Sequence, residues 1–520
     1  MKKDNSTKTS NTVFATASIV TALSVAERGL GFLYRIVLSR LIGAEGLGIY
    51  QVSLSLFALF LTLGTGGIPI TVSRLISKSK AENDINGEHG AVSAGITLSL
   101  LLTVPVLLIF LPFADTFTFL FSDNRCVSVF RILLIGLCFS SVYAVFRGSF
   151  WGNKNFLFPS IIEIAEETVM VIAGVLLLQR VDNALTGAKL AGVAVVISYL
   201  FSFTFSTIGY FACGGKLRSP KKALKPLFNA TLPLTSVRAS GSLVNSAVAV
   251  LLPAMLVRAG YTGADALELF GVVSGMAIPV LFIPATIIGS LSLVLVPELS
   301  EDYYKKNTKR LYKNLERGIS VSCLVACVLL PFFYALGNRL GSLAFSNLLA
   351  GEIISKGCVI LLPMSLTMIT TGMLNSMGCE KQTFLFYFVG AGAMLLCILL
   401  LPAVCGVYAY VIGLGVSYVL TCICNFWLLH KKCDGFMRGY GKGIIATTMR
   451  GICAVLPLSL LGKLFTALFS KIFGSVLTAV FSAIAIALCT LLLYLAFDFL
   501  QKDKTRANFP FYKRKKANTR

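Results

Sequence analysis

The sequence predicts an all-α integral membrane protein with about fourteen transmembrane helices. Hydrophobic residues make up 56% of the 520 residues and charged residues only 13%, whereas soluble domains carry about 25% charged residues. The mean hydropathy is +0.82. Apolar runs of about 20 residues or more recur along the chain, which is the length a helix needs to cross a bilayer. They lack the strict alternation of a transmembrane β-barrel, so helices are the remaining way to satisfy the backbone in lipid.

Fourteen apolar segments, separated by short polar breaks, account for most of the chain. No break between them is long enough to form a soluble domain. The predicted spans are 12–40, 46–76, 89–112, 126–150, 156–180, 185–213, 225–258, 264–297, 313–337, 352–378, 382–402, 404–430, 441–466 and 470–499.

Basic residues fall in alternate breaks and in both tails, with dense groups at 216–225 and 305–313. Because Lys and Arg collect on the cytoplasmic side, both termini are predicted to be cytoplasmic, as an even number of crossings requires. The excess of 46 Lys and Arg over 23 Asp and Glu is also typical of nucleic-acid binding, but its placement in short loops argues against that function. The chain is therefore predicted to be a multi-pass plasma-membrane protein.

A weak internal repeat divides the chain into halves. The segment RLIGAEG at 40–46 is similar to RAGYTGAD at 258–265, and GSFWGNK at 148–154 is similar to LNSMGCEK at 374–381. Parallel repeats are a common plan of transporters, with substrate held between the halves. The predicted organisation is a tail (1–11), a six-helix lobe (12–213), a second six-helix lobe (214–430), two further helices (431–499) and a basic tail (500–520).

The first and seventh spans carry polar groups that are costly in lipid. Arg28 and Arg35 are seven residues apart and share one helix face, as do Arg238 and Asn245. If the repeat is real, these faces meet across a cavity between the lobes. Guanidinium groups bind phosphates in a bidentate manner, so these four residues are predicted to bind an anionic substrate.

The fifth span carries Glu163, Glu166 and Glu167 on one face, and Glu27 precedes the arginines of the first span. These carboxylates could pair with the span-one arginines, bind a cation or exchange protons. They could also form a purely structural ion-pair network. They are predicted to be ion-coupling or ion-pairing residues.

Fourteen cysteines and two histidines show no metal-binding spacing, so no metal and no cofactor are predicted. Glycines and prolines interrupt several spans, which lets helices bend. These interruptions are at Gly64, Gly66, Gly67 and Pro69, at Pro279 and Pro284, and at Pro363.

Several segments together resemble the polysaccharide-transporter branch of the multidrug/oligosaccharidyl-lipid/polysaccharide exporter superfamily. Two are ERGLGFLYR at 27–35 and SRLIGAEGLGIYQ at 39–51. Three others resemble, more narrowly, the stage V sporulation protein B-like members of that family. They are GGIPITVSRLIS at 66–77, FRGSFWG at 146–152 and VPELSE at 296–301.

The resemblance implies two six-helix lobes in a V shape with pseudo-twofold symmetry, and helices 13 and 14 lining a groove for a lipid tail. Related flippases use first-helix arginines; Arg28 falls on such a position, while the second falls near Tyr34, next to Arg35. The implied function is to flip a lipid-linked glycan, an undecaprenyl-linked peptidoglycan precursor, to the outer leaflet by alternating access. The expected partners of this monomer are that substrate, membrane lipids and cell-wall synthesis proteins.

Two other functions remain open. A drug/cation antiporter of the same superfamily fits the glutamates of the fifth span but not an arginine-lined cavity. A membrane-embedded glycosyltransferase would need catalytic groups on a substantial loop, and the outer loops here are short. The chain is predicted to be a transporter rather than an enzyme.

Overall fold

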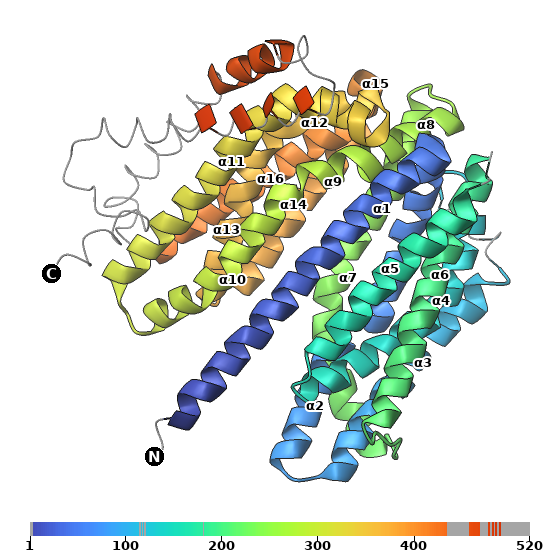
Figure 1. The fold of residues 1–520 in the computed structure, drawn as a ribbon, viewed down its shortest axis with the longest axis vertical. Helices are drawn as coiled ribbons and strands as arrows, with labels where there is room; N and C mark the ends of the chain where they lie inside the picture. The colour runs from blue at the N-terminus through green and yellow to red at the C-terminus, as the bar shows by residue number, and fades with distance from the viewer. Residues whose placement is uncertain are drawn as a thin grey trace. The chain divides into compact units, whose positions relative to one another are not determined.

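The computed structural model of the chain is built of helices (Figure 1). It describes residues 4–113, 116, 118, 121–179, 181, 183–433 and 457–468, together with the pairs 477–478, 481–482, 484–485 and 488–489. Within these ranges every regular element is helical and no strand occurs. The all-α prediction is confirmed.

The described chain divides into two compact units, the first made of Met1–Pro279 with Leu395–Tyr410, and the second of Val280–Met394 with Val411–Arg520. The helices of the first unit are α1 (Asp4–Thr65), α2 (Ile68–Ala81), α3 (Ile85–Phe110), α4 (Asn124–Gly152), α5 (Leu157–Leu178), α6 (Ala184–Ala212), α7 (Lys221–Arg258), α8 (Gly263–Phe270), the π-helix η2 (Gly271–Ala277) and the short α15 (Pro402–Cys405).

The second unit contains α10 (Ile283–Tyr304), α11 (Thr308–Phe345), α12 (Leu348–Gly357), the 3-10 turn η3 (Cys358–Ile360) and α13 (Leu361–Ser376). Three helices contain residues of both units: α9 (Ile278–Leu281), α14 (Glu380–Leu400) and α16 (Tyr408–Lys432). A further helix covers 457–468.

Each of the first twelve predicted spans coincides with helix. Eleven described helical stretches are long and apolar enough to cross a membrane, and the chain is a multi-pass membrane protein. The glutamate-bearing α5 is not one of the eleven. Most of the predicted spans 441–466 and 470–499, and all of the tail 500–520, lie outside the described residues. Helix α1 begins at Asp4, within the predicted tail 1–11.

Several of the predicted interruptions break the helices. The backbone of Gly43 leaves the helical region (φ 70°, ψ 179°) and kinks α1 between the first two predicted spans. The helical conformation is interrupted again between Thr65 and Ile68, and Pro69 lies in the first turn of α2. The predicted span 264–297 is divided into α8, η2, α9 and α10, with Pro284 in the first turn of α10.

Positive φ angles occur near both pairs of repeated segments. Gly43 and Gly260, in the first pair, have φ of 70° and 100°. Lys154 and Gly378, in the second pair, have φ of 60° and 75°. These residues do not occupy equivalent positions, and the repeat stays a prediction.

The first compact unit continues to Pro279, whereas the first lobe is predicted to end at residue 213. The division into two six-helix lobes stays a prediction. Helix α7 belongs to the first unit because polar groups fasten it to α1. The hydroxyls of Thr62 and Ser242 are 2.8 Å apart, and Ser246 Oγ donates to Ser55 O at 2.7 Å.

Side-chain caps start many of the helices. An Asp, Asn or Thr oxygen accepts a backbone N–H of the first turn, as at typical helix N-termini. These caps are Asp84, Asp123, Asn183, Thr262, Asn307 and Asn347.

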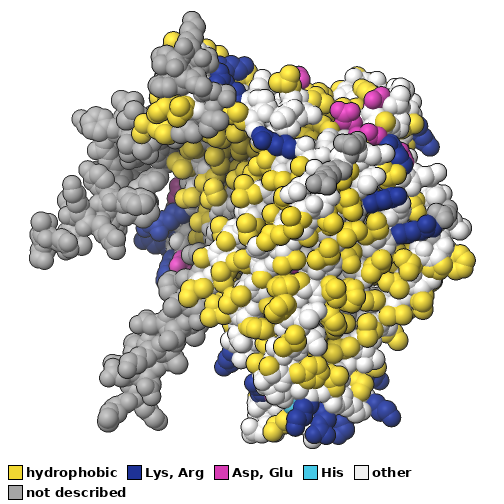
Figure 2. All heavy atoms as spheres, turned by 45° about the vertical axis from the view of Figure 1, so that its right-hand side comes forward, with side chains coloured by type: hydrophobic (Ala, Val, Ile, Leu, Met, Phe, Trp, Pro, Cys, Tyr) yellow, Lys and Arg dark blue, Asp and Glu magenta, His cyan; other side chains and the backbone are white. Residues whose placement is uncertain are grey.

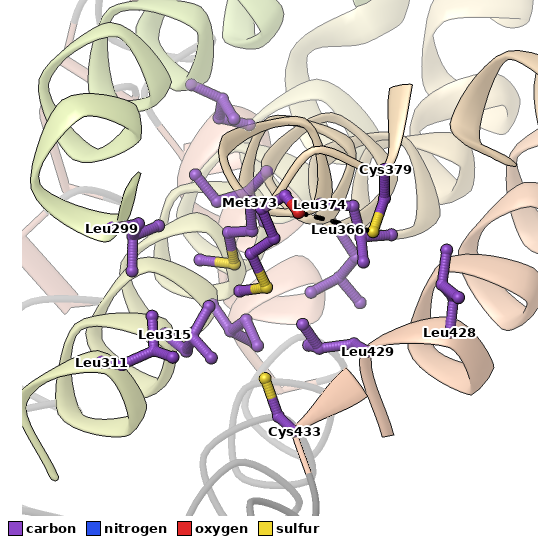
Figure 3. Close-up of a cluster of buried hydrophobic side chains, with 14 residues drawn as sticks. Leu299, Leu311, Leu315, Leu366, Met373, Leu374, Cys379, Leu428, Leu429 and Cys433 are labelled. Atoms are coloured by element: carbon purple, nitrogen blue, oxygen red, sulfur yellow. Dashed lines mark hydrogen bonds between the residues drawn. The ribbon is translucent and has the colours of Figure 1, made fainter. Parts of the chain in front are cut away.

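Each unit has its own apolar core. In the first, Ile68, Val72 and Ile76 of α2 pack with residues of α3, α4, α6 and α7. In the second, leucines of α10, α11, α13 and α16 point toward one another around Met373 (Figure 3). Exposed apolar side chains cover much of the face seen in Figure 2, as expected of helices whose solvent is lipid.

Candidate functional site

A polar pocket lies inside the first unit, among α1, α4, α5 and α6. Its volume is about 230 Å³. Four glutamates, two tyrosines and one arginine line it together with smaller side chains; these seven are Glu27, Tyr143, Arg147, Glu163, Glu166, Glu167 and Tyr199. The structure thus brings together all four glutamates predicted as ion-coupling or ion-pairing residues.

An ion pair between Arg147 of α4 and Glu163 of α5 lies in the pocket. The Arg147 Nη1 atom is 2.9 Å from Glu163 Oε1, and the two side chains are only 27% and 19% exposed. The guanidinium also lies over the ring of Trp151, 5.2 Å from its centroid, and near the ring of Tyr143. Glu163 therefore pairs with an arginine of α4 and not with those of the first span.

The other three glutamates form no ion pair with any residue that the structure describes. Glu27 interacts electrostatically with Glu163 and Glu167, so like charges face one another here. Oε1 of Glu167 would lie 2.7 Å from a Cβ placed on Gly31, which shows how closely the carboxylate approaches the α1 backbone. Arg147 is the arginine that lines the pocket beside the four carboxyl groups, while Arg28 and Arg35 of α1 interact electrostatically with Glu27 and Glu167.

An unpartnered hydroxyl lies beside these carboxylates. Tyr143 is 6% exposed, and its Oη has no hydrogen-bond partner among the described residues. Among all the residues that the structure describes, no three His, Cys, Asp or Glu side chains are placed to ligate one metal ion. The carboxyl groups and the tyrosine hydroxyl of this pocket can accept and donate protons.

The predicted substrate-binding arginines of α1 are exposed. Arg28 and Arg35 expose their side chains, and neither forms an ion pair within the described part of the chain. Arg35 interacts electrostatically with Glu167 and Tyr50, which links this face of α1 to the pocket.

The polar residues of α7 fall into two groups in the structure. Ser242 and Ser246 are used in packing against α1, whereas Arg238 and Asn245 are exposed. The cavity predicted from these residues stays a prediction.

Arg147 and Tyr143 are pocket residues that are absent from the set predicted from the sequence. The predicted span 126–150 includes Arg147 near its end, and in the structure α4 continues to Gly152, with Arg147 lining the pocket. The motif FRGSFWG at 146–152 carries the signal, because it places an arginine inside an otherwise apolar helix end.

Comparison with protein families supports the resemblance. The model of the family described as "Polysaccharide biosynthesis protein" matches residues 13–303. The chain belongs to this family. The matched range includes every residue of the pocket and all four predicted substrate-binding residues.

Relatives of this family member occur in Bacillus subtilis (strain 168). Stage V sporulation protein B is 26% identical over 340 residues, which is 62% of this chain and 64% of that protein. The match thus spans less than two thirds of that relative. Sporulation protein YkvU is 23% identical over 83% of this chain and 93% of its own length. Lipid II flippase MurJ is 22% identical over 58% and 60%.

Solved structures show the same fold. The inward closed conformation of lipid II flippase MurJ matches with a TM-score of 0.72 and 12% identity, covering 93% of this chain and 100% of that one. An inward-facing multidrug resistance MATE family transporter of the MOP superfamily matches with a TM-score of 0.67 and 15% identity, covering 79% and 96%. The fold is that of MOP superfamily transporters.

Proposed function

We propose that this chain flips a lipid-linked glycan, an undecaprenyl-linked peptidoglycan precursor, from the cytoplasmic to the outer leaflet by alternating access. The family match, a relative named as a lipid II flippase and the shared fold support this function. The substrate class rests on these relationships together with the arginines of α1.

The observation that carries the proposal is the exposure of Arg28 and Arg35 on α1, with no ion pair to either from the described residues. A guanidinium in a membrane helix is costly unless it faces water or an anion. Fork-shaped donors fit the oxygens of a pyrophosphate. The lipid tail would stay in the bilayer while these groups hold the headgroup, and no covalent chemistry is required.

The test is to replace Arg28 with alanine in cells depleted of the native protein. A charge-assisted hydrogen bond contributes about 1.5–3 kcal/mol, so flipping by Arg28→Ala should slow roughly tenfold or more. The lipid-linked precursor should then accumulate on the cytoplasmic side. Arg28→Lys keeps the positive charge but loses the bidentate hydrogen-bonding geometry of the guanidinium. Its flipping rate should lie between those of the wild type and Arg28→Ala.

Membrane abundance and thermal unfolding of each variant control for misfolding. Arg28 is exposed and has no ion-pair partner among the described residues, so both quantities should match the wild type. Normal flipping by a normally abundant Arg28→Ala,Arg35→Ala variant would remove these residues from the proposed substrate site.

The carboxylate pocket is the proposed point of ion coupling. Four carboxyl groups share one pocket inside a membrane unit, an arrangement that can take up protons or a monovalent cation. Replacing Glu166 and Glu167 with glutamine should make flipping in vesicles insensitive to the imposed ion gradient. Unchanged gradient dependence would leave the pocket with a structural role only.

The same pocket favours a second candidate function, a drug/cation antiporter, because an acidic cavity attracts cationic compounds. Expression in a host that lacks its drug exporters discriminates between the two functions. Raised resistance to cationic drugs, lost in Glu166→Gln, would support the antiporter. A glycosyltransferase gains no support, since the named relatives and neighbours are flippases, transporters or sporulation proteins.

A further inference from the structure

The connection between α6 and α7 is strongly basic and lacks acidic residues. We call residues 216–225 the basic loop, although they include the end of the connection and the start of α7, which begins at Lys221; the five cations are Lys216, Arg218, Lys221, Lys222 and Lys225. All five side chains are exposed, and none forms an ion pair with a described residue. Lysine and arginine side chains also gather at the lower end of the face shown in Figure 2.

Three hydrogen bonds hold the backbone at the start of the basic loop. Lys216 N donates to His89 Nδ1 at 3.3 Å, and Tyr210 Oη donates to Lys216 O at 2.9 Å. Arg218 N donates to Ser93 Oγ at 2.9 Å. The loop is therefore fastened to α3 and α6 on both sides of Leu217.

Close packing adds to these hydrogen bonds. A Cβ placed on Gly90 of α3 would lie 3.3 Å from Ser219 O. A connection that served only to bias membrane topology would need charge but no fixed backbone. Here the charges are presented from a backbone of defined geometry, so less ordering entropy is lost when a ligand binds.

Nearby acidic residues do not neutralise the loop. Glu88 lies 3.8 Å from Lys80, and Glu82 lies 3.8 Å from Lys78. The turn between α10 and α11 differs from the basic loop, because its Lys305 forms an ion pair with Glu301 at 2.5 Å. The basic loop thus has positive charge to offer an external anion.

The loop joins ends of helices that are long and apolar enough to span the membrane, which places it at the level of the lipid headgroups. Anionic phospholipids attract Lys and Arg near the surface by about 1 kcal/mol each, or roughly fivefold in affinity. We propose that the basic loop is a binding site for the headgroups of anionic phospholipids. The site is independent of the transported substrate.

Cys213 offers a probe for this site, because it is exposed and lies three residues before Lys216. The full-length chain, labelled with a fluorophore at Cys213, is reconstituted in phosphatidylcholine vesicles that contain nitroxide-labelled phosphatidylglycerol or nitroxide-labelled phosphatidylcholine. The Cys213→Ser variant gives the background from other thiols. The phosphatidylglycerol lipid should quench several-fold more strongly.

Two variants and a matched control decide the proposal. Lys216→Gln,Arg218→Gln removes two of the five charges and should lower the preference for phosphatidylglycerol several-fold, to nearly equal quenching by the two lipids. His89→Ala,Ser93→Ala keeps every charge of the loop but removes two fastening groups, and should lower the preference several-fold. Lys306→Gln,Lys309→Gln removes two charges from the α10–α11 turn and should leave it unchanged.

Equal quenching by the two lipids in the wild type would overturn the proposal. So would an undiminished preference in either loop variant, or an equal loss in the α10–α11 control. The substituted lysine and arginine side chains are exposed, so thermal unfolding should stay at the wild-type temperature.

Discussion

At the scale of the residue, Arg147 organises the polar pocket. It contributes the positive charge that faces Glu163, and its guanidinium packs on Trp151. The carboxylate it holds belongs to a cluster whose members repel one another. The ion pair is mostly enclosed, so its loss costs more than the loss of a surface pair.

Arg147→Gln should lower the free energy of unfolding by about 2 kcal/mol. The reason is that Glu163 loses a charge-assisted hydrogen bond, of about 1.5–3 kcal/mol, and is left without its partner beside other glutamates. Thermal or denaturant unfolding of the purified protein in detergent measures the change. The double variant Arg147→Gln,Glu163→Gln should recover at least half of it, since no unpaired charge is left. A double variant as unstable as the sum of the single variants would refute this account.

At the scale of the element, close backbone contacts fix α1 against α8 and η2. A Cβ placed on Gly48 would come within 1.9 Å of Leu267 O, and one placed on Gly271 within 2.2 Å of Ala44 O. Glycine at both positions lets the helix backbones touch. The kink at Gly43 has open space around it, so there the glycine is required by conformation (φ 70°) and not by packing.

Gly48→Ala should strongly reduce the amount of folded protein, because a methyl group cannot fit against the α8 backbone without moving a helix. Overpacking typically costs about 1–3 kcal/mol. Gly29→Ala, on the same helix, is the matched control, since a Cβ placed there would have no atom within 4 Å among the described residues. Folded yield and unfolding temperature are the measurements. Equal behaviour of the two variants would contradict the tight packing of α1.

At the scale of the whole molecule, the distribution of basic residues predicts that both termini are cytoplasmic. The structure supplies the helices that this prediction orients in the membrane. Connections at the two ends of α4 should lie on opposite sides of the membrane, because α4 is a spanning helix of 29 residues.

A membrane-impermeant thiol reagent tests this orientation in intact cells. Cys213, which follows α6, should react only after the cells are opened. In a Cys213→Ser background, a cysteine introduced by Asn124→Cys at the exposed start of α4 should react from outside. Reversed accessibility of the two sites would invert the predicted topology.

Much of this architecture could be predicted from the sequence. The helices, their breaks at Gly43, Pro69 and Pro284, and the shared face of Glu163, Glu166 and Glu167 follow from local composition and helical spacing. These features depend on residues close together in the chain, so one-dimensional patterns suffice to reveal them. Short sequence motifs also indicated the family resemblance, and the family match confirms it.

Tertiary structure decided which charges meet. The sequence suggested the span-one arginines as partners for the glutamates of α5, but the packing of α4 and α5 on α1 and α6 brings Arg147 to Glu163 instead. Tertiary structure also decided that α7 forms hydrogen bonds with α1 and that the backbone of the basic loop donates hydrogen bonds to His89 and Ser93. Such pairings join residues from different helices, and helical periodicity gives each side chain a direction but does not say which neighbouring helix it will face.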